Sequence, residues 1–194
     1  MEPIRAFIAV ELPDTVKSAL SAIQDSLKDR ERISVKWVDP ESVHLTLKFL
    51  GNVAPDAIPQ ITEAVSAASR ATPPFRLELS ELGGFPNLRA PRVLWVGIRG
   101  EIDSLSALQK SVDNALIPLG FPPEKKGFSP HLTLGRVREK ASANDRRRLG
   151  EIAALLGTES LPSFTVDSFN LMRSILAREG AIYSRLYTAS LEGA

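Results

Sequence analysis

The sequence predicts an α+β fold built from two similar lobes. Three observations predict it: strand-like and helix-like periodicities alternate along the chain, one pattern occurs twice, and 194 residues suffice for one domain with a substantial core. We expect a single bilobal domain over residues 1–194, with repeat-like units at about residues 4–82 and 92–174 related by a pseudo-twofold axis. Each lobe should contain an antiparallel sheet and flanking helices, and any active site should lie in the cleft between them.

The first half of the chain predicts strands and helices in turn. Residues 4–10 are apolar and β-branched, as in a buried strand, and a helix is expected to begin at Pro13-Asp14. One stripe of that helix carries Val16, Leu20, Ile23 and Leu27. Further strands are expected at residues 37–38, 44–50 and 75–79, and a helix at residues 55–69. Gly83-Gly84 should then interrupt the strand pattern.

The second half repeats this order. A strand is expected at residues 93–98, then a helix with an apolar stripe at Ile102, Leu105, Leu108, Val112 and Leu116. Residues 20–27 (LSAIQDSL) align without gaps to residues 105–112 (LSALQKSV), an offset of 85. His44-Leu45-Thr46-Leu47 recurs as His131-Leu132-Thr133-Leu134, an offset of 87. A helix-like stretch follows from Ala143, and late strands at residues 164–172 and 182–189 should complete the sheets.

The antiparallel arrangement is predicted from alternation within HLTLKFL. Residues two apart on a strand share a face, so His44, Thr46 and Lys48 should point one way and Leu45, Leu47 and Phe49 the other. A doubly wound α/β sheet is the main alternative. That fold would place a Gly-rich phosphate loop after the first strand, where this chain has Glu11-Leu12-Pro13-Asp14.

Composition limits the class of protein. Hydrophobic residues make up 43% and charged residues 24%, which excludes a disordered chain. The net charge of +1 argues against wrapping a long nucleic-acid backbone, although a short or terminal nucleotide ligand remains open. There is no cysteine, no apolar run near 18 residues and no signal-like N-terminus, so we expect a cytoplasmic protein, monomeric and without membrane contact.

The two HLTL copies predict the chemistry. Related by a pseudo-twofold axis, they would bring the imidazoles of His44 and His131 and the hydroxyls of Thr46 and Thr133 into one groove. This set suits a single phosphate, because hydroxyls can donate to its oxygens while one histidine gives a proton and the other takes one. A metal site usually needs three or four ligands, so we expect neither metal nor cofactor. Retention of the repeat for packing alone is the competing interpretation, but the leucines would suffice for that.

At these residues the chain resembles the two-histidine phosphoesterase superfamily, whose signature is His-hydrophobic-Thr-hydrophobic occurring twice. Within it the chain is most similar to the RNA 2′,3′-cyclic phosphodiesterases, also called 2′-5′ RNA ligases. The similarity covers nearly the whole length and departs from the signature in neither copy. It includes residues 5–13 (RAFIAVELP), 37–51 (WVDPESVHLTLKFLG), 92–97 (RVLWVG) and 129–136 (SPHLTLGR).

The resemblance implies hydrolysis of a 2′,3′-cyclic phosphate on an RNA end or small nucleotide, leaving a 2′-phosphate. It implies that His44 is the general acid on O3′, that His131 is the general base on water, and that Thr46 and Thr133 bind the phosphate. Phe7 would pack against the nucleobase, and Arg136 would stack on it or touch the phosphate. Open alternatives are 2′-5′ ligation, a nucleotide-binding module without turnover, and another substrate such as a cyclic phosphate on ADP-ribose or a 2′-5′ oligoadenylate.

Overall fold

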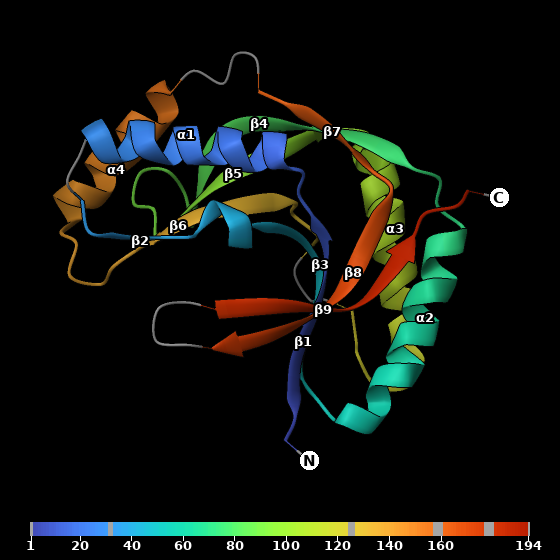
Figure 1. The fold of residues 1–194 in the computed structure, drawn as a ribbon. Helices are drawn as coiled ribbons and strands as arrows, with labels where there is room; N and C mark the ends of the chain where they lie inside the picture. The colour runs from blue at the N-terminus through green and yellow to red at the C-terminus, as the bar shows by residue number, and fades with distance from the viewer. Residues whose placement is uncertain (1, 31–32, 124–126, 157–160, 177–180, 194) are drawn as a thin grey trace.

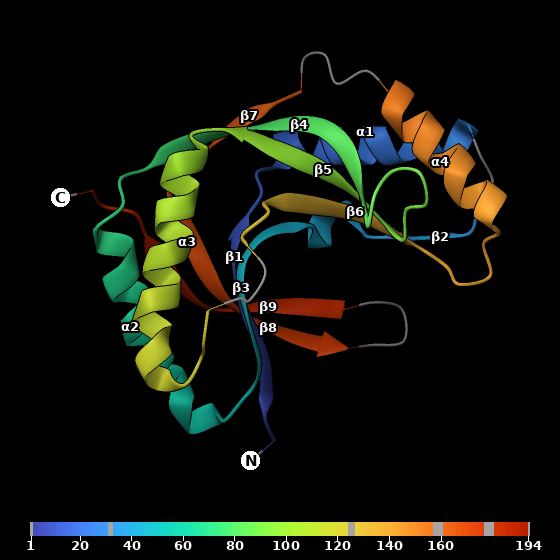
Figure 2. The same ribbon diagram turned by 180° about the vertical axis from the view of Figure 1, so that it is seen from behind.

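Two antiparallel sheets meet at an angle, and a pair of helices covers the outer face of each (Figures 1 and 2). The computed structural model describes residues 2–30, 33–123, 127–156, 161–176 and 181–193. Every strand pair within these ranges is antiparallel, which excludes the doubly wound alternative. The predicted bilobal α+β fold is confirmed. No helix of these ranges has the length and apolar character that spanning a membrane requires.

The first sheet has the strand order β3-β1-β8-β9 and the second the order β2-β6-β5-β4-β7. The first consists of β1 (Ile4–Glu11), β3 (His44–Val53), β8 (Ser168–Leu176) and β9 (Ala181–Ser190). The second consists of β2 (Val35–Trp37), β4 (Phe75–Phe85), β5 (Val93–Gly100), β6 (His131–Val137) and β7 (Ser163–Val166).

The two halves of the chain exchange elements between the sheets. β4, from the first half, pairs with β5 of the second sheet, whereas β8, from the second half, pairs with β1 of the first sheet. The helices are exchanged too: α1 (Asp14–Arg30) and α4 (Ala143–Leu155) lie on the second sheet, and α2 (Ile58–Arg70) and α3 (Ile102–Leu116) lie on the first (Figure 2). One hydrophobic cluster therefore runs through both lobes.

The predicted helices are confirmed, with shifts at their ends. The stripe of α1 is buried, as expected for an amphipathic helix. The helix expected from residue 55 begins as a short 3₁₀ turn, Pro55–Ala57, before α2. A capping box starts α4, in which the Ser142 hydroxyl and the Asp145 carboxylate each accept a backbone N–H from the other residue. Two further 3₁₀ turns lie at Pro40–Ser42 and Ile117–Leu119.

The strand interruption predicted at Gly83-Gly84 is wrong. β4 continues through both glycines, and Gly83 pairs with Trp95 of β5. A Cβ atom on Gly83 would come within 2.1 Å of the Trp95 ring, so glycine here leaves room for the indole on the strand surface.

The single late strand predicted for residues 164–172 is also wrong. It is divided at Asp167: β7 pairs with β4 in the second sheet, and β8 then pairs with β1 and β9 in the first. The chain crosses between the sheets at this residue, whose carbonyl accepts the N–H of Leu191 at 2.7 Å. Alternation alone could not locate the crossing, because both strands are regular on either side of it.

Candidate active site

The two HLTL copies begin strands that meet at the junction of the sheets. His44 is the first residue of β3, His131 is the first residue of β6, and the two strands contact one another. The repeat predicted from the sequence therefore occupies corresponding places in the two lobes.

A β-bulge follows each histidine at the same offset. In the first sheet Ala9 pairs with Thr46 and Ile8 with Lys48, so Leu47 is the extra residue. In the second sheet Trp95 pairs with Thr133 and Leu94 with Gly135, so Leu134 is the extra residue. Each bulge bends its strand and shifts the alternation by one residue, so that side chains after the signature exchange faces.

The bulge makes the predicted faces of Lys48 and Phe49 wrong. Lys48 is only 2% exposed and lies on the core side with the leucines, whereas Phe49 is 63% exposed and lines the cleft. Arg136 is the counterpart of Phe49 in the second copy and is likewise exposed on the cleft side. Side chains alternate between the two faces of a strand only while every residue has a partner on the neighbouring strand. The unpaired extra residue interrupts this alternation.

Both imidazoles are anchored through the same nitrogen. Nδ1 of His44 lies 2.9 Å from the carbonyl oxygen of Ser42, and Nδ1 of His131 lies 2.8 Å from that of Ser129. A carbonyl can only accept a hydrogen bond, so Nδ1 carries the proton in each neutral ring. Nε2 is then the nitrogen that can exchange a proton with a ligand.

Aromatic side chains orient each histidine. The His44 ring lies 4.6 Å from the Phe7 ring and meets Tyr183 edge to face at 5.0 Å. The His131 ring meets Phe85 edge to face at 4.9 Å, with Trp95 beyond it at 6.2 Å. These contacts limit the rotation of both imidazoles.

Burial disfavours the charged form of the His44 ring. Desolvation lowers its pKa from 6.5, while the carbonyl of Ser42 and the carboxylate of Glu11 oppose this by favouring the charged ring. Burial also raises the pKa of Tyr183, against the opposing charges of Arg136 and Arg5, so its hydroxyl stays a neutral donor.

A cavity of about 550 Å³ brings the predicted residues together. It is lined by all six of them: Phe7, His44, Thr46, His131, Thr133 and Arg136. Phe7 is only 3% exposed and lies beneath His44, which leaves little of its ring for a ligand. The described ranges contain no group of three or more histidine or acidic residues placed to hold a metal ion.

Comparison with known proteins places this arrangement in a family. The model of the LigT-like phosphoesterases matches the chain twice, at residues 10–95 and 96–183. The chain belongs to the LigT-like phosphoesterase family. The double match agrees with the repeat seen in the sequence, and the confirmed resemblance covers both copies of the signature.

One curated relative and two solved structures match this LigT-like phosphoesterase over nearly their full length. An RNA 2′,3′-cyclic phosphodiesterase of Methanothermobacter thermautotrophicus is 37% identical over 181 residues, which is 93% of this chain and 95% of that protein. The crystal structure of a Thermus thermophilus protein superposes with a TM-score of 0.78 at 29% identity, covering 98% of this chain and 99% of that one. The crystal structure of Escherichia coli LigT complexed with 3′-AMP superposes with a TM-score of 0.74 at 27% identity, covering 98% of this chain and 99% of that one.

Several lining residues of this cavity were not predicted from the sequence, and three of them have aromatic or charged side chains. Phe49, Arg5 and Tyr183 line the same space as the two histidines. Phe49 lies 87 residues before Arg136, the spacing of the histidines themselves, so the repeat contained a signal for it. Tyr183 comes from β9, which lies beyond the repeat-like units, and had no such signal.

Proposed function

We propose that this phosphoesterase hydrolyses a 2′,3′-cyclic phosphate at an RNA end or on a nucleotide, leaving a 2′-phosphate and a free 3′-hydroxyl. One observation carries the proposal: two imidazoles, each with Nδ1 bound to a carbonyl, line one cavity together with two threonines. The names of the relatives, RNA 2′,3′-cyclic phosphodiesterases, and the binding of 3′-AMP by a protein of the same fold support it.

The proposed reaction needs only groups of this chain. Nε2 of His131 takes a proton from water as the water oxygen attacks phosphorus, and the bond from phosphorus to O3′ breaks. Nε2 of His44, protonated beforehand, gives its proton to the departing O3′. The hydroxyls of Thr46 and Thr133 donate to the non-bridging oxygens, where negative charge gathers. No metal or cofactor takes part.

The remaining predicted residues act around this centre. Arg136 supplies a positive charge at the cavity wall, for the phosphate or for stacking on the base. Phe7 holds the His44 ring from below and offers its remaining surface to the base. A single chain supplies all of these groups, and we propose that it acts as a monomer in the cytoplasm.

The product of the reaction tests the proposal. The chain is incubated, in the presence of EDTA, with adenosine 2′,3′-cyclic phosphate and with a short RNA ending in a cyclic phosphate. ³¹P NMR should show a 2′-phosphate only, formed at the same rate with and without the chelator. A 3′-phosphate, or no turnover of either substrate, would contradict the proposal.

The titration of His44 gives an independent prediction. In the free protein we expect its pKa below 6.5, because burial disfavours the charged ring. A bound phosphate anion stabilises the imidazolium and should raise that pKa. By linkage, phosphate then binds more tightly as the pH falls through the raised value. NMR of the histidine Cε1 protons, with and without inorganic phosphate, measures both states.

His131→Ala leaves only one histidine in the chain and so assigns the signals. A His44 pKa at or above 6.5 in the free protein, or one that phosphate does not move, would rule out this account of the ring.

A further inference from the structure

A second, larger cavity continues the cleft beyond the histidines. Its volume is about 950 Å³, and it shares His44, Arg136 and Tyr183 with the smaller cavity. Each is within the size range of small-molecule sites, so the cleft has room for more than one nucleotide. Of the residues that line the larger cavity, the proposed hydrolysis uses only those that it shares with the smaller one.

Two cations face one another on the wall of this larger cavity. Lys36 of β2 is the direct partner of Arg136 of β6, so their side chains leave the same face of the sheet. Both side chains are exposed, and both line the cavity. Within the part of the chain that the structure describes, neither has a carboxylate within ion-pair distance. Like charges directly opposite one another destabilise a sheet, unless an anion lies between them.

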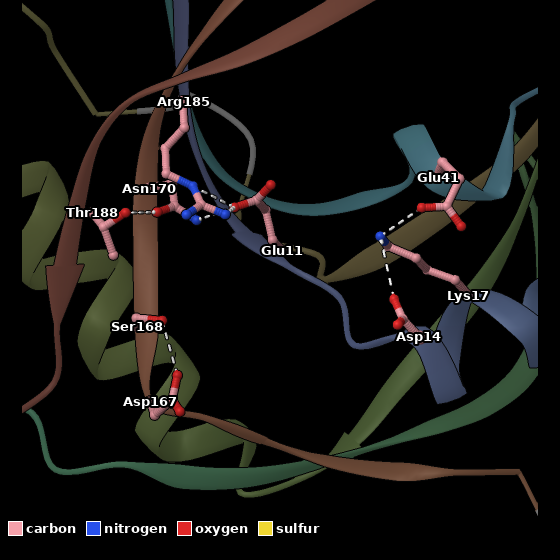
Figure 3. A network of polar contacts seen from close by, with 9 residues as sticks. All are labelled: Glu11, Asp14, Lys17, Glu41, Asp167, Ser168, Asn170, Arg185 and Thr188. Carbon is pink, nitrogen blue, oxygen red and sulfur yellow. Dashed lines mark hydrogen bonds and ion pairs between the residues drawn. The ribbon is translucent and has the colours of Figure 1, made fainter.

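Two of the carboxylates that line the same cavity, Glu11 and Glu41, are already bound to cations (Figure 3). Glu11 accepts hydrogen bonds from Arg185 at 2.6 Å and from Asn170 at 2.7 Å. Glu41 accepts from Lys17 at 2.8 Å. Asp39 accepts the backbone N–H of Glu41 at 3.0 Å as the cap of a 3₁₀ turn. Among the described residues Asp39 has no cation within ion-pair distance, so two unpaired cations, Lys36 and Arg136, stand against one unpaired carboxylate and the net charge left on this wall is positive.

We propose that Lys36 and Arg136 bind the phosphodiester that joins the terminal nucleotide of an RNA to the nucleotide before it. This inference rests on the proposed function, which puts the cyclic phosphate beside His44 and His131 in the smaller cavity. The RNA strand would then continue into the larger cavity, where Trp37 and Tyr183 offer aromatic surface to the base of the preceding nucleotide. This second phosphate site would therefore favour an RNA end over a free mononucleotide.

Turnover of three substrates tests this second phosphate site independently of the catalytic centre. They are adenosine 2′,3′-cyclic phosphate, the dinucleotide ApA with a terminal 2′,3′-cyclic phosphate, and the same dinucleotide with an uncharged methylphosphonate linkage. For the unchanged protein, kcat/KM should be about fivefold to tenfold higher on the charged dinucleotide than on the uncharged one. Lys36→Gln should remove most of this difference while leaving mononucleotide turnover unchanged.

Salt supplies a second readout. One phosphate contact to a single strand contributes a slope of about 0.7 in the logarithm of affinity against the logarithm of salt concentration. Lys36→Gln should reduce the slope of kcat/KM for the charged dinucleotide by about that amount. The slope for the mononucleotide should not change. Lys36→Arg should keep the wild-type behaviour, and so should Lys110→Gln, which removes an exposed lysine from α3, outside both cavities.

The results distinguish the two proposals. Turnover of the mononucleotide together with equal rates on both dinucleotides, or a Lys36→Gln variant identical to the unchanged protein, would overturn the second phosphate site alone. Absence of turnover on all three substrates would overturn the proposed hydrolysis and the site that rests on it.

Discussion

Replacement of either His44 or His131 with alanine should lower kcat by at least about two orders of magnitude, the usual contribution of one acid or base. Each imidazole has Nδ1 bound to a carbonyl and lines the shared cavity, and the proposed mechanism assigns one proton transfer to each free Nε2, which alanine lacks. Steady-state rates on adenosine 2′,3′-cyclic phosphate measure the loss. The double variant should be little slower than the singles, because groups that act as a unit on one phosphate do not contribute additively.

Thermal unfolding of the variants controls for loss of fold. The pH profile of kcat/KM then assigns the roles. An acid must be protonated, so removal of His44 should flatten the high-pH limb; a base must be neutral, so removal of His131 should flatten the low-pH limb. If removal of His44 flattened the low-pH limb and removal of His131 the high-pH limb, the two roles would be reversed. If either single variant kept a kcat within tenfold of that of the unchanged protein, the two-histidine mechanism would be wrong.

Asp113→Ala should destabilise the protein by about 3 to 5 kcal/mol, because it would leave a buried ammonium without its partner. The Lys48 side chain is 2% exposed and the Asp113 side chain 11%, and the two form an ion pair between β3 and α3. Gln109 donates to the same carboxylate at 2.7 Å, and Lys48 also donates to the carbonyl of Pro122 at 2.8 Å. Urea unfolding, monitored by circular dichroism, measures the change.

Two further variants show whether burial causes this effect. Glu78→Ala breaks an exposed ion pair with Arg99, in which the Glu78 side chain is 40% exposed and the Arg99 side chain 64%. It should lower the free energy of unfolding by less than about 1 kcal/mol. Replacement of both buried partners, Lys48→Met with Asp113→Leu, should restore most of the loss, since no charge is then left unpaired. An Asp113→Ala variant as stable as Glu78→Ala would show that the buried charge is compensated in another way.

The pattern of the sequence located most of the helices and strands of this fold. The apolar stripes of α1 and α3 and the alternation in β3 and β6 are local signals, carried by neighbouring residues. The repeat also predicted that both histidines belong to one site. Their Nδ1 contacts come from the residues two positions earlier, Ser42 and Ser129, and are as local as the motif itself.

Other features needed the strand pairing. Lys48 and Phe49 changed faces because Leu47 has no partner on β1. The strand through Gly83 continues because an indole from β5 lies against it. These outcomes depend on residues far away in the chain, and period-two alternation contains no information about them.

By itself, then, the sequence was enough to predict the chemistry that we propose for this protein: a duplicated strand motif would supply two imidazoles and two hydroxyls to one phosphate. The tertiary structure alone decided which sheet each strand joins, and so what surrounds that phosphate. Phe49, Tyr183 and the facing pair of Lys36 and Arg136 reach the cleft through exchanged strands, bulges and cross-strand register. Their positions follow from long-range pairing, which is settled only when the whole chain has folded.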